Sequence, residues 1–419
     1  MIICRAVQRL FFSNILLLIF LNLLVKPFYL FGIDVQVQNL VGQEAYGLYF
    51  SLLNFSFLFN IFQDLGITNY NTKNIAAHPH LVKGYLGRVL GLRITLGILY
   101  FALTIGLALI LGYDNISMHI LSLLVLNQVL VGMILYFRSN FAGLLWFKTD
   151  ALFSVLDRVL LISICLVLLY HGSFRSSFDI TWFVYAQTAA YGTVALLGLF
   201  LTFRYLKVPV LRLKRKYAIA IIKKSWPFAL LVLLMMLYTR MDAVMLERLL
   251  PNGKVEAGIY AQGFRILDAV NIFGLLAAGL LLPIFANLLQ NKQPIQPLLN
   301  SVTKLVLGTA IATGMIAVYF SQELMSWIYH ADYTESAIVF PWIILSFIPI
   351  AATYIFGTLL TAAGELKRLN QLAALGILVN FTLNWLVIPE YGAAGAAVVT
   401  LITQSIAGIG QIVLVNYYF

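Results

Sequence analysis

The sequence predicts an all-α integral membrane protein of about twelve transmembrane helices, arranged as two pseudo-symmetric six-helix lobes around a central cavity. Composition, evenly recurring apolar runs and an internal repeat support this fold class. Of the 419 residues, 62% are hydrophobic and 10% are charged, whereas soluble globular chains are roughly half apolar and a quarter charged. A soluble fold cannot bury that much apolar surface, so we expect the bilayer to surround most of the chain.

Apolar runs long enough to cross a bilayer recur along the whole chain. A spanning helix needs about 20 mostly apolar residues. Spans are expected near residues 11–33, 46–66, 89–111, 116–137, 152–170, 182–203, 226–250, 264–289, 301–320, 338–362, 371–388 and 393–415. Arg5 and Arg9 precede the first run as in a signal peptide, but no small-residue cleavage site follows, so we interpret this run as an uncleaved first helix. Pro27, Pro283 and Pro349 interrupt spans and are hinge candidates.

Basic residues are sorted by side, which predicts the orientation. With the N-terminus inside, the inner connections hold Arg5, Arg9, Lys73, Lys83, Arg88, Arg93, Arg138, Lys148, the 204–224 cluster, Lys292, Lys304, Lys367 and Arg368. The outer basic residues are Arg175, Arg248 and Lys254. The outer connections carry the acids Asp34, Glu44, Asp114, Asp179, Glu256, Glu323, Asp332, Glu335 and Glu390. The positive-inside rule then places both termini in the cytoplasm.

The densest basic stretch separates the two predicted lobes. We expect an N-terminal lobe at 1–203, a basic cytoplasmic linker at 204–225 and a C-terminal lobe at 226–419. Because the net charge of +11 is sorted by side, no nucleic-acid partner is expected. An additional role of the linker as a surface helix on anionic membrane lipids stays open.

Two short motifs recur at one offset. The repeated segments are Gly47-Leu48-Tyr49 with Gly258-Ile259-Tyr260, and Asn60-Ile61-Phe62 with Asn271-Ile272-Phe273. Both pairs lie 211 residues apart (258 less 47, and 271 less 60). This offset maps the first six spans onto the last six, as in transporters whose halves are related by an axis along the membrane normal. The alternative is a chance match in apolar sequence.

Cations inside the spans suggest a site for an anion. Lys26 is predicted deep in the first span and Arg240 deep in the seventh; position 26 maps onto Leu237, one turn from Arg240. Intramembrane charges usually face a bundle interior or a water-filled cavity. Such cations would attract a polyanion such as pyrophosphate, for which Arg offers bidentate hydrogen bonds. The alternatives are snorkelling, or an ion pair with Asp242.

Polar stripes are predicted on the second and eighth spans. The stripe on the second span consists of Asn54, Phe57, Asn60 and Asp64, within roughly a 120° arc. That on the eighth consists of Arg265, Asp268 and Asn271. Arg265 occupies the repeat position of Asn54. Both stripes are expected to face the cavity, although Arg265 and Asp268 also suit a simple intrahelical pair.

No catalytic or metal motif is present in the sequence. There is no Gly-rich phosphate loop with Lys-Ser/Thr and no His-Glu-x-x-His, so ATP-driven pumping is unsupported. Cys4 and Cys165 are far apart, and His78 with His80 is interpreted as a solvated pair. We therefore expect no cofactor, no metal and no catalytic residue.

Six segments carry a family resemblance. They are Val41–Tyr49 (VGQEAYGLY), Asp64–Ile67 (DLGI) followed by Asn74–Ala76 (NIA), Arg240–Asp242 (RMD), Gly258–Tyr260 (GIY) and Pro389–Ala397 (PEYGAAGAA). In this order they resemble the multidrug/oligosaccharidyl-lipid/polysaccharide exporter superfamily, and in particular its Wzx-type polysaccharide flippases. The resemblance spans essentially the whole chain. Drug exporters and the related lipid II flippases of the superfamily remain alternatives.

The resemblance implies a substrate and a location. Such proteins move undecaprenyl-pyrophosphate-linked oligosaccharides from the cytoplasmic to the periplasmic leaflet of the bacterial inner membrane, before polymerisation into O-antigen, capsule or exopolysaccharide. Partners would then be this lipid-linked glycan, membrane lipids and the glycan polymerase machinery. The lobes would rock by alternating access.

The predicted site residues divide into two groups. Those expected to bind substrate are Lys26, Arg240, Arg265, Asn54 and Asn60, and those that are candidates for ion coupling are Asp64, Asp242 and Asp268. The rival class is a membrane glycan polymerase, ligase or glycosyltransferase, which needs placed carboxylates or a sizeable outer loop. The longest outer connection, about Ser321 to Ala337, is short, so the transporter interpretation is favoured.

Overall fold

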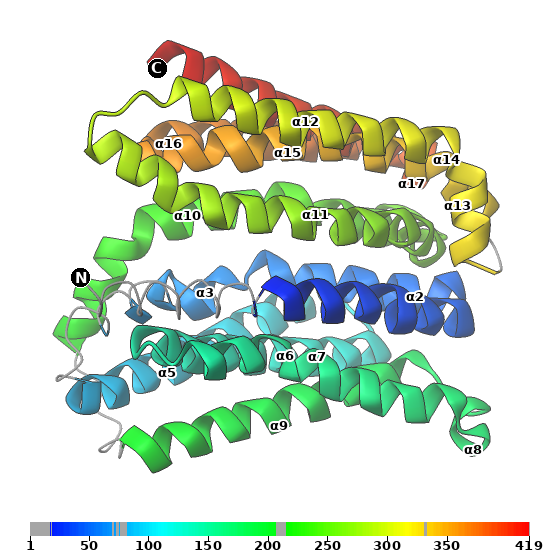
Figure 1. Cartoon of the computed structure of the whole chain (residues 1–419). Helices are drawn as coiled ribbons and strands as arrows, with labels where there is room; N and C mark the ends of the chain where they lie inside the picture. The colour runs from blue at the N-terminus through cyan, green and yellow to red at the C-terminus, as the bar shows by residue number, and fades with distance from the viewer. Residues whose placement is uncertain are drawn as a thin grey trace. The chain divides into compact units, whose positions relative to one another are not determined.

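The computed structural model describes residues 17, 19–68, 71–72, 75, 82–206, 215–330 and 333–418. All regular elements among these residues are helices (Figure 1). They are η1 (Leu30–Asp34), α2 (Val35–Leu58), α3 (Ile61–Asp64), α5 (Val82–Ile110), α6 (Asn115–Gly143), α7 (Phe147–Tyr170), α8 (Gly172–Arg175), α9 (Ile180–Leu206), α10 (Arg215–Leu249), α11 (Gly253–Gln290), α12 (Gln296–Tyr319), α13 (Ser321–Ile328), α14 (Thr334–Leu345), α15 (Phe347–Ala352), η3 (Thr353–Gly357), α16 (Thr358–Ala363) and α17 (Leu366–Tyr418).

Several residues used in the sequence predictions lie outside the described part of the chain. They are Cys4, Arg5, Arg9, Lys73, His78, His80 and Asp332. Residues 207–214 of the predicted 204–225 linker also lie outside it; α9 ends just before this stretch and α10 begins just after it.

The predicted spans are confirmed. The described residues contain ten helices long and apolar enough to cross a membrane, from Ile19–Leu58 to Leu366–Tyr418. At 1.5 Å per residue, these two helices of 40 and 53 residues are about twice the length that a bilayer core of about 30 Å needs. Each of the two is bent at one glycine, and counting two passes in each gives the twelve expected passes.

The two bends depend on backbone conformations that favour glycine. Gly42 has φ 80° and ψ 172°, and Gly392 has φ 52° and ψ −136°. A side chain at either φ would be strained whatever the space around it. The first bend separates the predicted first and second spans, and the second bend separates the predicted eleventh and twelfth spans.

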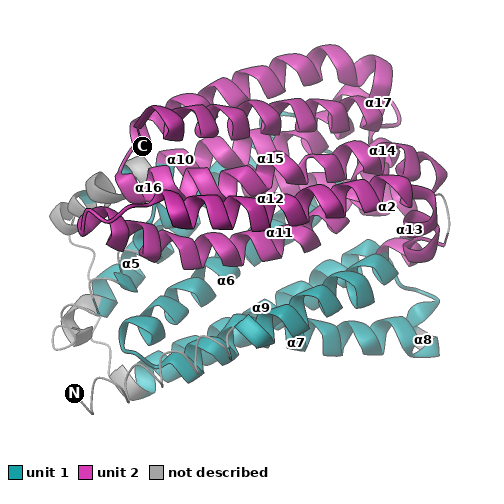
Figure 2. Ribbon diagram, turned by 45° about the horizontal axis from the view of Figure 1, so that its top comes forward, with its two compact units in different colours: residues 1–37, 59–229 teal, residues 38–58, 230–419 magenta. Residues whose placement is uncertain are grey.

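The chain forms two compact units, coloured separately in Figure 2. Unit 1 consists of Met1–Val37 and Phe59–Ala229, and unit 2 of Gln38–Leu58 and Leu230–Phe419. The second half of α2 therefore groups with unit 2, whereas the predicted lobe boundaries at 203 and 226 assigned it to the N-terminal lobe. The cause is close packing of this segment on α11, where Gln38 donates a side-chain hydrogen bond to the Gly258 carbonyl at 3.2 Å.

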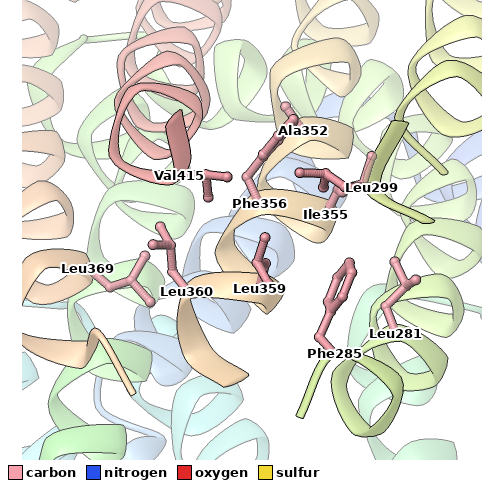
Figure 3. Close-up of a cluster of buried hydrophobic side chains, with 10 residues drawn as sticks. All are labelled: Leu281, Phe285, Leu299, Ala352, Ile355, Phe356, Leu359, Leu360, Leu369 and Val415. Atoms are coloured by element: carbon pink, nitrogen blue, oxygen red, sulfur yellow. The ribbon is translucent and has the colours of Figure 1, made fainter. Parts of the chain in front are cut away.

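The core of unit 2 is a cluster of aliphatic and phenyl side chains from α11, α12 and the helices near the C-terminus (Figure 3). Its buried members are Leu281, Phe285, Leu299, Ala352, Ile355, Phe356, Leu359, Leu360, Leu369 and Val415. The two members that are farthest apart in the sequence, Leu281 and Val415, are separated by 134 positions. This packing joins η3 and α16 to α11, α12 and α17.

Unit 1 is built around α6, which packs on α5, α7 and α9. Its largest buried side chains include Tyr136, Phe137 and Phe141 of α6 and Phe183 of α9. The Tyr136 hydroxyl donates to the Leu86 carbonyl at 3.0 Å. A buried tyrosine needs such a partner for its hydroxyl.

Candidate functional site

Unit 2 brings together three charged side chains predicted from the sequence. Arg240 of α10 and Arg265 of α11 each approach a different carboxylate oxygen of Asp268, with N···O distances of 3.6 Å. Arg240 also reaches the side-chain oxygen of Asn54 at 3.5 Å. One carboxylate is thus shared by two guanidinium groups: the intrahelical Arg265–Asp268 pair is present, and Arg240 of α10 joins it.

Aromatic rings hold both arginines in place. The Arg240 guanidinium lies over the rings of Phe57 and Phe264, at 5.3 and 5.2 Å from their centroids. Arg265 lies over Phe50 at 5.2 Å and donates to the Tyr46 hydroxyl at 2.8 Å. Cation–π contacts orient a guanidinium while using few of its N–H donors.

Arg240 retains donors for an anion. The contacts of Arg240 with Asn54 and Asp268 lie at 3.5 and 3.6 Å, at or beyond the limit for a hydrogen bond. The side chains of Arg240 and Asp268 are both 22% exposed. A planar guanidinium in this setting can turn two N–H groups toward a phosphate oxygen pair.

Asp242 is buried in a separate polar network in unit 2. Its Oδ1 accepts from Asn380 and Asn384 of α17, at 2.9 and 2.6 Å. Its Oδ2 accepts from the hydroxyls of Tyr260 and Thr400, at 3.1 and 2.6 Å. The residue is 1% exposed, and among the described residues it has no ion pair with Arg240. The predicted alternative of an Arg240–Asp242 pair is therefore wrong.

Lys26 belongs to unit 1, where its nearest charges are mostly positive. Arg158 and Arg138 lie within electrostatic range of it, as does Asp157. No hydrogen bond or ion pair within the described part of the chain involves Lys26. The Arg138 guanidinium is already paired with Asp150 at 2.8 Å.

Arg158 is a residue that the sequence predictions missed. Its guanidinium lies 4.8 Å from the Tyr29 ring centroid and 5.4 Å from that of Tyr191, and it hydrogen-bonds the Tyr191 hydroxyl. An ionisable residue inside the predicted 152–170 span was the available signal. It places a second cation beside Lys26.

Asn60 and Asp64 form part of a polar seam in unit 1. Asn60 donates to Gln128 at 3.2 Å and accepts from Gln63. Asp64 pairs with the buried Arg93 at 2.7 Å. Arg93, expected in an inner connection, is 3% exposed and lies within the helix α5 instead of a connection.

The predicted stripe on the second span is broken. A turn at Phe59 and Asn60 separates α2 from α3, so Asn54 falls in unit 2 and Asn60 in unit 1. The stripe assumed a continuous helix through this turn. Asp34 also differs from expectation, because it is 1% exposed in the π-helix η1 and is not an outer-loop acid.

Residues of the family-like segments have structural roles. A Glu256 carboxylate oxygen accepts from the Ala393 backbone N–H at 2.8 Å, directly after the Gly392 bend.

Within the described residues, no three His, Cys, Asp or Glu side chains are placed to hold a metal ion.

Comparison with known proteins identifies the family. Residues 11–289 match the family described as polysaccharide biosynthesis protein. The chain is 26% identical over 189 residues to the capsular polysaccharide biosynthesis protein CapF of Staphylococcus aureus, covering 44% of this chain and 45% of CapF. It is 28% identical over 179 residues to the uncharacterized membrane protein YabM of Bacillus subtilis (strain 168), covering 40% of this chain and 33% of YabM. The match thus spans less than half the length of either relative.

Solved structures share the fold over nearly the whole chain. An inward-facing multidrug resistance MATE family transporter of the MOP superfamily aligns with a TM-score of 0.71 at 13% identity, covering 95% of this chain and 94% of that one. The lipid II flippase MurJ, in an inward closed conformation, aligns with a TM-score of 0.67 at 14% identity, covering 97% of this chain and 86% of that one. Because the family match covers well over half of the residues, this multi-pass membrane protein belongs to the polysaccharide biosynthesis protein family, and it has the fold of MOP-type transporters.

Proposed function

We propose that the protein is a flippase for undecaprenyl-pyrophosphate-linked oligosaccharides. It would move a precursor of O-antigen, capsule or exopolysaccharide from the cytoplasmic to the periplasmic leaflet of the bacterial inner membrane by alternating access. Family membership supports a role in polysaccharide biosynthesis. The names of CapF and of the lipid II flippase MurJ are consistent with a lipid-linked glycan as substrate.

The observation that carries the proposal is the pair of arginines around Asp268. A charged side chain at membrane depth is costly, and its retention indicates a partner. Among the described residues, the polar contacts of Arg240 are long, at 3.5 Å to Asn54 and 3.6 Å to Asp268. A pyrophosphate would supply closer, charge-assisted hydrogen bonds to Arg240 and Arg265. Lys26, which lacks an ion pair within the described residues, is the candidate in unit 1 for binding the pyrophosphate.

Ion coupling is proposed at Asp242. Four donors surround its carboxylate. A buried carboxylate that has no ion pair within the described part of the chain is suited to exchange a proton or sodium ion. Asp64 and Asp268 are the remaining candidates from the sequence. Both already contact arginines, so Asp242 is the best supported of the three.

The alternatives are export of drugs or of another lipid-linked substrate by the same fold, and an enzyme that uses lipid-linked sugars. A drug exporter would favour cationic or apolar ligands, which the two arginines would repel or leave unused. An enzyme would form or break a glycosidic bond. Purified protein in liposomes distinguishes them, because a flippase moves the lipid-linked glycan unchanged.

The test uses a strain that lacks this chain. The wild-type gene should restore surface glycan and remove the lipid-linked intermediate that accumulates in the cytoplasmic leaflet. Lys26→Gln and Arg240→Gln should abolish both effects at normal expression, whereas Lys304→Gln, at an exposed position of α12, should behave like wild type. Full glycan export by both neutral variants would show that these residues do not hold the pyrophosphate.

A further inference from the structure

Unit 2 contains two adjoining cavities next to the arginine pair. One of about 170 Å³ is lined by Arg240, Asp268 and Asn271, and one of about 160 Å³ is lined by Gln411. Four residues line both cavities: Met235, Tyr238, Thr353 and Tyr354. All of these residues belong to unit 2, so the double cavity lies within one unit.

Buried oxygens on these walls have no hydrogen-bond donor. They are the Asn271 Oδ1, Thr353 Oγ1 and Gln411 Oε1 atoms, none of which has a partner among the described residues. The Gln411 side chain is 6% exposed. Leaving a buried polar atom unpaired is unfavourable, so its retention in a cavity wall points to a ligand that donates hydrogen bonds.

Comparison with its repeat counterpart supports a ligand-binding role for Asn271. Asn60, its counterpart 211 positions earlier, is bonded to Gln128 and Gln63 in unit 1. Asn271 has kept the same side chain, but its oxygen lines a cavity instead. The second copy of this position is therefore free for a ligand.

Three side chains of the cavity walls pack closely against glycines, in space that a larger residue would fill. The Tyr354 ring packs where a Cβ on Gly274 would lie, and the Tyr238 ring lies 3.4 Å from the Cβ position of Gly376. Gln411 Oε1 lies 2.6 Å from the Cβ position of Gly357, the last residue of the π-helix η3. Short π-helical segments occur often at functional sites, and these walls are firmly positioned.

The chemistry of the walls fits a sugar. Most of the lining is apolar or aromatic, with a few placed polar groups, as in small-molecule sites. A hexose has a C–H face for the tyrosine rings and hydroxyl donors for the amide oxygens. Each cavity is well above the roughly 10–15 Å³ that one water needs on the same measure, so each has room for a group larger than a water.

A metal cation or a prenyl chain fits less well. Asp268 is the acidic residue among the lining residues of the two cavities, and it is already shared by two guanidinium groups. A metal ion would therefore meet two positive charges. A prenyl chain would leave the three acceptor oxygens without donors.

We propose that this double cavity receives the sugar attached directly to the lipid pyrophosphate, while Arg240 holds the phosphates. The inference rests on the proposed function, because it assigns a pocket to one part of that substrate. The first sugar of such a lipid is bonded to the pyrophosphate, so its pocket must adjoin the anion site. Arg240 and Asp268 in the wall of the larger cavity meet this requirement.

The experiment compares two lipid probes on the full chain in nanodiscs. One is farnesyl pyrophosphate, and the other is the same lipid carrying one sugar, drawn from glucose, galactose, N-acetylglucosamine and N-acetylgalactosamine. At least one sugar should strengthen binding over the bare lipid. Asn271→Leu and Gln411→Leu should each reduce that gain by up to about tenfold, the value of one hydrogen bond. Binding of farnesyl pyrophosphate should stay unchanged.

Gln290→Leu, at an exposed position of α11, is the matched control, and thermal unfolding identifies any variant that fails to fold. If farnesyl pyrophosphate binds but no sugar adds affinity, or if the variants weaken both probes equally, the sugar pocket is refuted while the anion site stands. If the wild-type protein binds none of the probes, the proposed function is refuted, and the sugar pocket with it.

Discussion

Gly47 and Gly258 each lie against the backbone of the other's helix. A Cβ on Gly47 would collide with the Lys254 carbonyl oxygen, and a Cβ on Gly258 would collide with the Gln43 carbonyl oxygen. Positions 43 and 254 are also 211 residues apart, so the two contacts exchange under the repeat. Reciprocal contacts of this kind are what a two-fold relation requires, and they support the repeat predicted from two short motifs.

Alanine at either glycine should destabilise unit 2. No side chain can move aside, because the colliding atoms belong to backbone, and overpacking of this kind costs about 1–3 kcal/mol or more. Thermal unfolding of purified Gly47→Ala and Gly258→Ala in detergent measures the loss. Gly279→Ala on the same helix α11 has nothing within 4 Å of its Cβ and should be neutral or stabilising. Equal melting temperatures for all three variants would show that the crossing is not close-packed.

Glu256→Ala should weaken the start of the final pass after Gly392. The carboxylate accepts from the Ala393 N–H at 2.8 Å, and loss of such a helix cap costs about 0.5–2 kcal/mol. The same unfolding measurement tests it. Glu256→Gln keeps an acceptor oxygen and should retain part of the stability; a larger loss in the Gln variant than in the Ala variant would contradict the cap.

Asp64→Asn should lower stability, because Asp64 is the partner of a buried arginine. Arg93 is 3% exposed, but the Asp64 side chain is 30% exposed and Arg93 also donates to the Gln63 carbonyl. The loss should therefore fall below the roughly 3–5 kcal/mol that breaking a fully buried pair costs. A double-mutant cycle with Arg93→Met should show a coupling energy of about 1–3 kcal/mol. If Asp64→Asn unfolds like wild type but removes the ion dependence of transport, Asp64 is a coupling residue and not a structural one.

The sequence predicted the spans well because apolar runs of bilayer length are local patterns. It also singled out Arg240, Arg265 and Asp268, since ionisable residues are conspicuous in such runs. It placed Asp34 in a loop because the π-helix η1 extends the helix past the predicted end of the first span. It missed the role of Arg158, whose significance depends on the Tyr29 and Tyr191 rings from two other helices.

Local sequence patterns also could not predict that residues 38–58 group with unit 2. It results from packing of α2 on α11 through glycines more than 200 positions apart. The break at Phe59 and Asn60 carries no proline or glycine, so a continuous helix was the natural prediction. The grouping and the break both separate Asn54 from Asn60, which the predicted polar stripe had assigned to one face of one helix.

Asp242→Asn should preserve the fold while removing ion coupling. The amide oxygen can accept from Asn380 and Asn384, and the amide N–H₂ can donate to the hydroxyls of Tyr260 and Thr400, which rotate to accept. Asp242→Leu would instead remove the acceptor that four buried donors share. Thr400 keeps the Ala396 carbonyl, Asn384 keeps the Asn380 oxygen and Tyr260 keeps the Thr400 hydroxyl. The Asn380 amide loses its acceptor, at about 1–3 kcal/mol. The Asn variant should therefore unfold near the wild-type temperature, and the Leu variant below it.

The transport arm of this test uses the purified protein in liposomes that hold a proton or sodium gradient. Wild-type flipping of the lipid-linked glycan should slow when an ionophore collapses the coupling gradient. The Asp242→Asn variant should flip at one low rate with or without the ionophore, because a neutral amide cannot exchange a cation. If this variant keeps the wild-type response to the ionophore, the coupling ion binds elsewhere, and the four donors around Asp242 serve only to stabilise the packing of α10, α11 and α17.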